Sequence, residues 1–361
     1  MANPKKESGI ALRYLKLENF KAFDSFEINF PAPRMKDDPD IFVLGSKNGL
    51  GKTSVLEACA LLFLCACSGK KELIIHRRHD FPIDLTELLI RAGKESAIIE
   101  GMFDCKKEPA KVKLKMGKNR IFECSGDLEL FKKYRQEQYL SREEIAEYLQ
   151  SCLAGLNSDP LVLPPFMYFH SYRKVQEGNP EFGMMVSGRR YNRVRFRPGY
   201  EYPISTFKLE ILRSMMGKAE LFETLDDEKA GEVLEKLNEL VKKYAGGTIS
   251  KLRPSPDNTI DFRIVPTGGG ESFTFDGLSS GQKEIISTHF LIWYYTRQKP
   301  GIVLIDEPEL HLNAEWHRDF IRQAHTLVPG NQYILATHSE DVFASVPEDR
   351  RALLVESPVH A

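Results

Sequence analysis

One stretch of this sequence, Val43–Ser54 (VLGSKNGLGKTS), combines glycines, a lysine and hydroxyl side chains. The apolar residues before it predict a strand end, and those after it predict an apolar helix. Gly49 and Gly51 allow backbone N–H groups to turn inward around an anion, and the helix N-terminus adds its positive dipole end. Lys52 can then reach the terminal phosphates of a nucleotide, and the Thr53 hydroxyl can bind Mg²⁺. We therefore predict a phosphate-binding loop formed by Asn48, Gly49, Leu50, Gly51, Lys52, Thr53 and Ser54.

This loop departs from the usual pattern at one position. In G-x-x-x-x-G-K-[ST] the first glycine would fall at Ser46, whereas the nearest glycine, Gly45, lies one residue earlier. Serine is small and is tolerated in turns, so we interpret the loop as a variant. The alternative is a glycine turn that happens to precede Lys-Thr.

Two adjacent carboxylates, Asp306 and Glu307, follow the apolar run Ile302–Ile305. Four consecutive β-forming residues predict a strand buried on both faces. Because consecutive side chains of a strand point to opposite sides, we expect the two carboxylates to have different roles. Asp306 suits the ligand shell of Mg²⁺, and Glu307 suits polarising a water molecule. The alternative is a strand followed by an ordinary acidic turn.

A histidine follows another apolar run, Tyr333–Ala336. A lone histidine is usually structural. His338, however, lies just past the predicted strand, at the end where open α/β sheets bind their ligands.

A fourth motif begins a second apolar helix and consists of Ser279, Ser280, Gly281 and Gln282. Hydroxyl groups and free backbone N–H groups at a helix start make an anion site. The alternative is an ordinary helix cap.

The segments between these motifs indicate how the chain positions them. Alternating or continuous apolar residues predict strands at 11–17, 25–30, 41–44, 96–104, 111–116, 120–123, 161–168, 249–252, 259–266 and 272–275. Helices are predicted at 53–67, 127–156 and 206–244, and the last should restart near Asp226-Asp227-Glu228. We expect an N-terminal half at 1–94, an inserted β-meander and helical lobe at 95–245, and a C-terminal half at 246–361.

Composition excludes some classes of protein. The 361 residues include 50 basic and 51 acidic side chains, so overall charge gives no argument for nucleic acid or a membrane surface. Lys111, Lys113 and Lys115 alternate with apolar residues, which favours the wet face of a strand over a DNA-binding stripe. Six cysteines without a CxxC pair indicate reduced thiols. Without a signal peptide or an apolar run of about 18–20 residues, we expect a cytoplasmic protein with no membrane partner.

Four motifs, taken in their order along the chain, resemble those of the ABC-type ATPase heads. They are the phosphate loop, LSSGQ, IDEPELHL and ATHS. The resemblance is greatest to the SMC/RecF-like and OLD-like branch, which the opening LENFKAF also resembles. It covers about Ala11–Cys67 and Asp276–Val346. It implies an α/β fold, a P-loop NTPase of the ABC-ATPase type with an inserted β-and-helical lobe.

The resemblance also implies roles for individual residues in a Mg²⁺-dependent ATPase. Lys52 would hold the β- and γ-phosphates of ATP, and Thr53 with Asp306 would hold Mg²⁺. Glu307 would be the general base or orient the water, and His338 would contact the γ-phosphate.

In this family ATP lies between two heads, so a homodimer or higher homo-oligomer is implied. Ser279 would contact the γ-phosphate bound by the opposite subunit, and 309–313 would cross that interface. Gln176 is a candidate for the glutamine at the junction of core and lobe. Arg173 is an equally open candidate for a phosphate or partner contact.

The resemblance leaves the biological role open. It favours a sensor, clamp or scaffold in DNA maintenance or anti-phage defence. Because no Toprim nuclease domain is expected in this chain, the effector would be a separate nuclease or toxin. The arginine-rich stretch 189–197 fits DNA or RNA, a partner protein or a solvated loop. A transporter's ATPase subunit and an ATP-dependent scaffold with little turnover are the alternatives.

Overall fold

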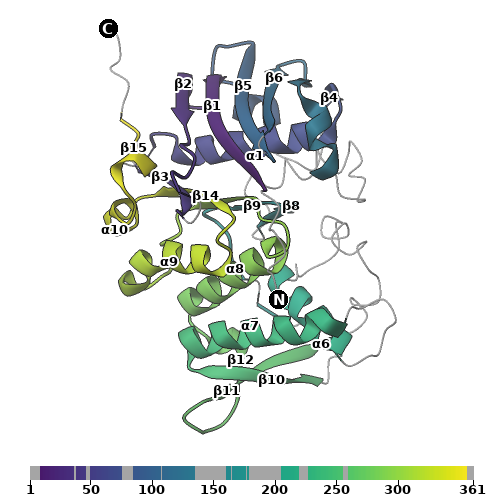
Figure 1. The fold of residues 1–361 in the computed structure, drawn as a ribbon, viewed down its shortest axis with the longest axis vertical. Coiled ribbons are helices and arrows are strands. Elements are labelled where there is room, and N and C mark those ends of the chain that lie inside the picture. The colour runs from purple at the N-terminus through teal and green to yellow at the C-terminus, as the bar shows by residue number, and fades with distance from the viewer. Residues whose placement is uncertain are drawn as a thin grey trace. The chain divides into compact units, whose positions relative to one another are not determined.

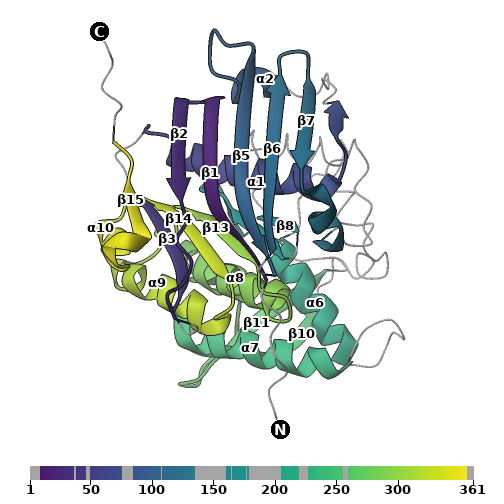
Figure 2. The same cartoon turned by 45° about the horizontal axis from the view of Figure 1, so that its top comes forward.

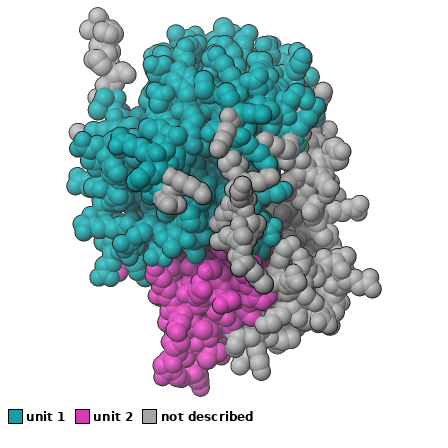
Figure 3. All heavy atoms as spheres, in the orientation of Figure 1, with its two compact units in different colours: residues 1–172, 295–309, 314–361 teal, residues 173–294, 310–313 magenta. Residues whose placement is uncertain are grey.

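The computed structural model describes residues 9–35, 38–45, 49–74, 84–106, 108–134, 160–163, 165–175, 177–178, 205–218, 227–254 and 259–355. Contacts divide the chain into two compact units, coloured teal and magenta in Figure 3. Unit 1 comprises residues 1–172, 295–309 and 314–361, and unit 2 comprises 173–294 and 310–313.

A six-stranded antiparallel sheet forms one part of unit 1, and Figure 2 shows most of its strands side by side. Its order is β2 (Phe23–Asn29), β1 (Ile10–Phe20), β5 (Ser96–Cys105), β6 (Glu108–Gly117), β7 (Ile121–Gly126) and β4 (Glu72–Ile74). The strands after residue 95 therefore pair with the N-terminal strand β1 through β5. For this reason the contact units do not follow the boundaries expected at 94/95 and 245/246.

One face of this sheet is polar, as the alternation in β6 predicts. Val112, Leu114 and Met116 are fully buried. Lys113 Nζ lies 2.7 Å from Glu100 Oε1 on the neighbouring strand, and Lys111 approaches the same carboxylate. These cross-strand pairs confirm a solvated face, because the lysine charges are matched by carboxylates.

The second sheet of unit 1 carries the motifs. Its order is β15 (Arg351–Leu353), β3 (Asp40–Gly45), β14 (Gln332–Thr337), β13 (Ile302–Asp306), β9 (Phe166–Phe169) and β8 (Leu161–Leu163). All pairs are parallel except β8 with β9. A parallel sheet brings the carboxyl ends of its strands to one edge, so the residues after β3, β13 and β14 lie near one another.

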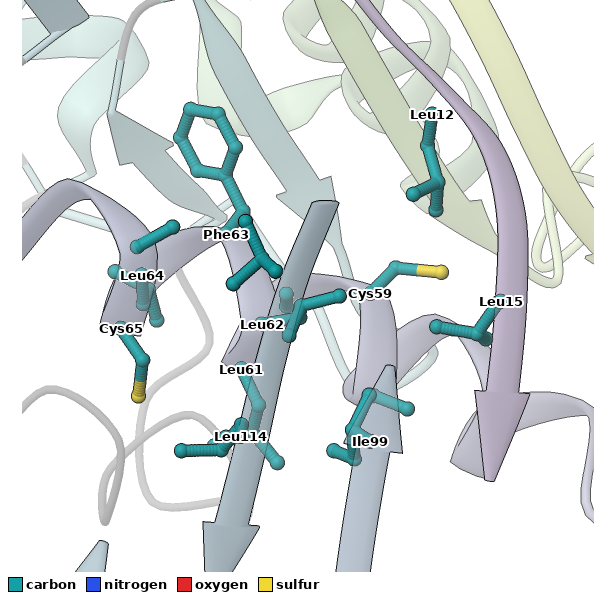
Figure 4. Close-up of a cluster of buried hydrophobic side chains, with 14 of the residues drawn as sticks. Leu12, Leu15, Cys59, Leu61, Leu62, Phe63, Leu64, Cys65, Ile99 and Leu114 are labelled. Carbon is teal, nitrogen blue, oxygen red and sulfur yellow. The ribbon is translucent and has the colours of Figure 1, made fainter. Parts of the chain in front are cut away.

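The helix α1 (Lys52–Ser68) packs against strands of both sheets, as Figure 1 shows. Its sequence is apolar on every side, and it is buried along nearly its whole length. Figure 4 shows Ile99 and Leu114 of the antiparallel sheet beside Leu61 and Leu62 of α1. The close approach depends on a glycine, because a Cβ at Gly101 would lie 2.5 Å from a Leu62 methyl group.

A buried side chain also joins the two sheets. Gln332 at the start of β14 accepts a hydrogen bond from Leu12 N at 2.7 Å and donates one to Leu12 O at 2.8 Å. The amide thereby satisfies two backbone groups of β1 that lie before the residues paired with β2.

Short elements complete unit 1. They are α2 (Leu85–Leu89), α9 (Ala314–Leu327), α10 (Glu340–Ala344) and the 3₁₀ helices η1 (Leu128–Tyr134) and η4 (Glu348–Arg350). α9 buries Phe320, Ile321 and Ala324 on one helical face, since Ala324 lies four and three residues after the other two.

Unit 2 contains α6 (Thr206–Lys218), α7 (Asp227–Ala245), η3 (Phe275–Gly277), most of α8 (Ser280–Thr296) and a three-stranded antiparallel sheet. The sheet has the order β10 (Gly247–Pro254), β11 (Ile260–Pro266) and β12 (Phe273–Thr274). A buried ion pair supports the start of α8, since Lys208 Nζ lies 2.5 Å from Asp276 Oδ1 and 2.7 Å from Gly178 O.

Most predicted elements are confirmed, including the helix that restarts at Asp227. The single strand predicted at 161–168 is wrong. It is the hairpin of β8 and β9, because Pro164-Pro165 interrupts the run. Residues 135–156 of the predicted helix, Ser46, Asn48, Gln176 and the stretch 189–197 lie outside the described residues. No helix in the part of the chain that the structure describes is long and apolar enough to cross a membrane.

Candidate active site

The phosphate loop connects β3 to α1. Gly49 and Gly51 have φ angles of 84° and 90°, which glycine adopts without strain. A Cβ at Gly49 would meet no atom within 4 Å, whereas one at Gly51 would lie 2.6 Å from the Phe23 ring. No acidic side chain lies in the first turn of α1, so none of its own residues offsets the positive end of the helix dipole. These glycines therefore allow the backbone to turn around an anion. Leu50 is part of the loop, and Ser54 lies in the first turn of α1.

Lys52 is the first residue of α1 and is buried, with 5% of its surface exposed. Its Nζ lies 2.9 Å from His338 Nε2, which follows β14. Burial lowers the pKa of Lys52, and the carboxylates of Asp306, Glu307 and Glu309 oppose that shift. An ammonium in this position is suited to bind an incoming polyphosphate, since the ligand would supply negative charge that the burial makes favourable.

Thr53 and Asp306 form the candidate magnesium position. Thr53 Oγ1 donates a hydrogen bond to Asp306 Oδ2 at 2.8 Å, and Asp306 is fully buried at the end of β13. A hydroxyl and one carboxylate, completed by phosphate oxygens and water, are a typical donor set for Mg²⁺. Among the described residues, no three His, Cys, Asp or Glu side chains gather as an all-protein metal site. The donor set therefore fits a metal that binds together with a nucleotide.

The two adjacent carboxylates differ in burial and in backbone conformation, because β13 ends at Asp306. Glu307 has a φ of 48°, a left-handed conformation that is unfavourable for a residue with a side chain. Its N–H donates to Ala336 O at 2.7 Å, which fixes this turn against β14. The side chain is consequently about 30% exposed, and its Oε1 lies 3.5 Å from His338 Nε2. The Glu307 carboxylate is thus partly exposed beside His338, whereas the Asp306 carboxylate is buried beside Thr53.

The serine and glycine motif belongs to unit 2. Ser279 Oγ accepts a hydrogen bond from Gln282 N at 3.3 Å, and Gln282 Oε1 accepts one from Ser279 N at 3.0 Å. This reciprocal pattern is a capping box at the start of α8, where Ser280 is exposed. Gly281 packs closely on the segment 310–313, since a Cβ there would lie 2.3 Å from His311 O. The structure thus places these residues at an ordered helix start.

Three features escaped prediction from the sequence. Lys21, in the turn between β1 and β2, bonds Glu57 of α1 at 2.5 Å. Burial raises the pKa of Glu57, and Lys21 opposes the shift. Arg173, left open as a phosphate contact, is a buried partner of Glu284 within unit 2. The third feature is Glu309, whose carboxylate accepts hydrogen bonds from the backbone beside His338. In the sequence it is marked only as a further carboxylate two residues after Glu307.

The fold is that of the solved SMC heads, and the family models that match this chain describe AAA domains. A family model described as "AAA domain" matches residues 14–244, more than half of the chain, and the chain belongs to that family. A second model, "AAA domain, putative AbiEii toxin, Type IV TA system", matches residues 170–344. Membership supports nucleotide binding and, at the level of the family, ATP hydrolysis.

Part of this chain is also similar to the protein "Retron Vc95 probable ATPase" of Vibrio cholerae serotype O1 biovar El Tor. It is 26% identical over 130 residues, which are 33% of this chain and 25% of that protein. The matched region therefore spans about a quarter of the relative's length.

Solved SMC heads share the fold. The SmcHead bound to the C-winged helix domain of ScpA has a TM-score of 0.53 at 13% identity, covering 93% of this chain and 92% of that one. The Smc head domain with an extended coiled coil, bound to the C-terminal domain of ScpA from Pyrococcus furiosus, has a TM-score of 0.50 with the same identity and coverage. At this identity the likeness concerns the fold alone.

Proposed function

We propose that this protein binds ATP with Mg²⁺, hydrolyses it, and uses the cycle to pair and separate two heads. The observation that carries the proposal is the meeting of Lys52, Thr53, Asp306, Glu307 and His338 in one unit, at the start of α1 and at the carboxyl ends of β13 and β14. This set contains a cation for the phosphates, oxygen ligands for the metal and a carboxylate able to act on water.

Each side chain has a task in this proposal. Lys52 and the loop N–H groups bind the β- and γ-phosphates, and Thr53 with Asp306 hold Mg²⁺, which offsets phosphate charge when bound. Glu307 orients the attacking water and accepts its proton, because its carboxylate is the exposed one of the pair. His338, whose ring lies 2.9 Å from Lys52 Nζ, contacts the γ-phosphate beside that lysine.

Pairing of two heads follows from Ser279. In related heads this position faces the nucleotide of the opposite subunit, and the capping box here leaves its helix start ordered and exposed. ATP would then bridge two copies, so that binding favours the closed pair and hydrolysis removes the bridge.

We further propose that the head works with a separately encoded effector, a nuclease or a toxin, in defence or DNA maintenance. The descriptions of the toxin–antitoxin family model and of the retron ATPase support this setting, and the ScpA-bound SMC heads show that such folds engage other proteins. Matched charges on the strand β6 give no support to DNA binding on that face.

Light scattering tests the pairing. Glu307→Gln with Mg-ATP should have about twice the mass that it has with Mg-ADP, because the variant binds ATP and retains it. Glu315→Gln, an exposed residue of α9, is the control and should show no accumulation. A mass of one chain in both nucleotides would contradict the head-to-head proposal.

A further inference from the structure

One carboxylate beside the site binds three consecutive residues of the turn that carries His338. Glu309 Oε2 accepts a hydrogen bond from Thr337 Oγ1 at 2.8 Å. Its Oε1 accepts from His338 N at 2.7 Å and from Ser339 N at 3.1 Å. All three partners donate their hydrogen bonds to Glu309. A carboxylate matches them, because its two oxygens accept hydrogen bonds and donate none.

The remainder of the turn is held independently of Glu309. Ser339 N also donates to Thr337 Oγ1 at 2.9 Å, and Ser339 Oγ accepts from Val342 N as the cap of α10. His317 of α9 contacts the same hydroxyl at 3.3 Å. The backbone N–H of His338 itself is bonded by Glu309.

A second tie joins the same two segments of chain. Glu307 N donates to Ala336 O at 2.7 Å, two residues before Glu309 and two before His338. The stretch after β13 and the stretch after β14 are thus fastened by a backbone bond and by a side chain. Together these contacts set the separation of 3.5 Å between the Glu307 carboxylate and the His338 ring.

We propose that Glu309 is a positioning residue that holds His338 against Lys52 and Glu307, so that it governs turnover rather than nucleotide affinity. The proposal rests on the ATPase function above. Misplacement of a reacting group by about 1 Å can lower a rate about 100-fold, whereas binding of the nucleotide depends mainly on the phosphate loop. A competing role is purely electrostatic, because the charge of Glu309 also acts on Lys52.

Two variants separate geometry from charge. The three hydrogen bonds of Glu309 to Thr337, His338 and Ser339 are called the clasp. A glutamine at 309 can accept both backbone N–H bonds through Oε1 and donate to Thr337 Oγ1 through its amide, so it keeps the clasp without the charge. Glu309→Gln should keep kcat within about threefold of wild type. Glu309→Ala should lower kcat about 10- to 100-fold with KM changed less than about threefold. Equal losses in both variants would overturn the positioning role.

A double-mutant cycle tests whether Glu309 acts through His338. In a His338→Ala background, Glu309→Ala should lower kcat less than about twofold further, because the ring that it positions is already absent. Multiplicative losses would show that Glu309 acts elsewhere. Thermal unfolding of each variant identifies any loss that comes from a damaged fold.

A spectroscopic readout works without turnover. The protein has nine histidines, so ¹⁵N-histidine labelling gives a small set of backbone amide peaks, and His338→Gln identifies that of His338. This peak should shift in Glu309→Ala and stay close to its position in Glu309→Gln. A wild type that releases no phosphate, but shows this shift, would refute the ATPase function and leave the clasp standing. An unshifted peak in an active enzyme would refute the clasp.

Discussion

Lys52 is the residue at which stability and nucleotide binding should oppose each other. The residue has 5% of its surface exposed, and burial lowers the pKa of its ammonium despite the nearby carboxylates. A shift in that direction means that the folded state disfavours the charged lysine. Lys52→Met keeps the volume and removes the charge, so it isolates this effect.

The expected magnitudes have opposite signs. Without nucleotide, Lys52→Met should raise the free energy of unfolding by about 1 kcal/mol, the usual gain when a strained functional group is replaced. With nucleotide, the lost charge-assisted hydrogen bonds are worth about 1.5–3 kcal/mol, so affinity should fall about 10- to 100-fold.

The pH dependence follows from the direction of the shift. Because the folded-state pKa lies below the ordinary 10.5, the charged lysine destabilises the fold at neutral pH. That penalty is lost as the pH rises from the folded-state pKa to the unfolded one. The advantage of Met should therefore be present at pH 7 and shrink toward pH 10.5.

Urea unfolding without nucleotide and titration with a fluorescent ATP analogue measure the two effects. Lys94→Met is the matched control, since Lys94 is exposed, and it should change stability by less than about 0.5 kcal/mol. A less stable Met variant, or one that binds the analogue as wild type does, would refute the reasoning.

Two further substitutions test the packing that supports the site. Gly281→Ala should lower stability by about 1–3 kcal/mol, because its Cβ would lie 2.3 Å from His311 O. Gly231→Ala in α7, whose Cβ would meet nothing within 4 Å, should instead raise stability by about 0.5–1 kcal/mol, and the same sign in both would contradict the close approach. Gln332→Leu should cost about 3 kcal/mol in urea unfolding, since it leaves Leu12 N–H and C=O buried without partners. Wild-type stability of that variant would show that water or a shifted strand replaces both bonds.

The meeting of the motifs at the candidate site was predictable, because each motif is short and continuous. The phosphate loop, the acidic pair and the histidine each follow an apolar strand, and a parallel sheet brings such strand ends together. The clasp of Glu309 was not predictable in this way. It joins residues 28–30 positions apart through backbone N–H groups, which every residue carries, so no residue type marks it.

The division of the chain was harder to predict for a related reason. The strands after residue 95 form a local meander in the sequence, and nothing in that pattern shows that β5 pairs with β1. Strand pairing between distant segments depends on the shape of the buried surfaces, here the close packing of α1 at Gly101. The boundary thus depends on tertiary packing rather than on local periodicity.

Phosphate release from Mg-ATP by wild type and Glu307→Gln tests the central claim most directly. Wild type should release several phosphates per chain, and the variant should release phosphate at least about 100-fold more slowly while it still binds ATP. Equal rates in the two proteins, or no release by wild type, would contradict the assignment of this site as an ATPase centre with Glu307 acting on the water.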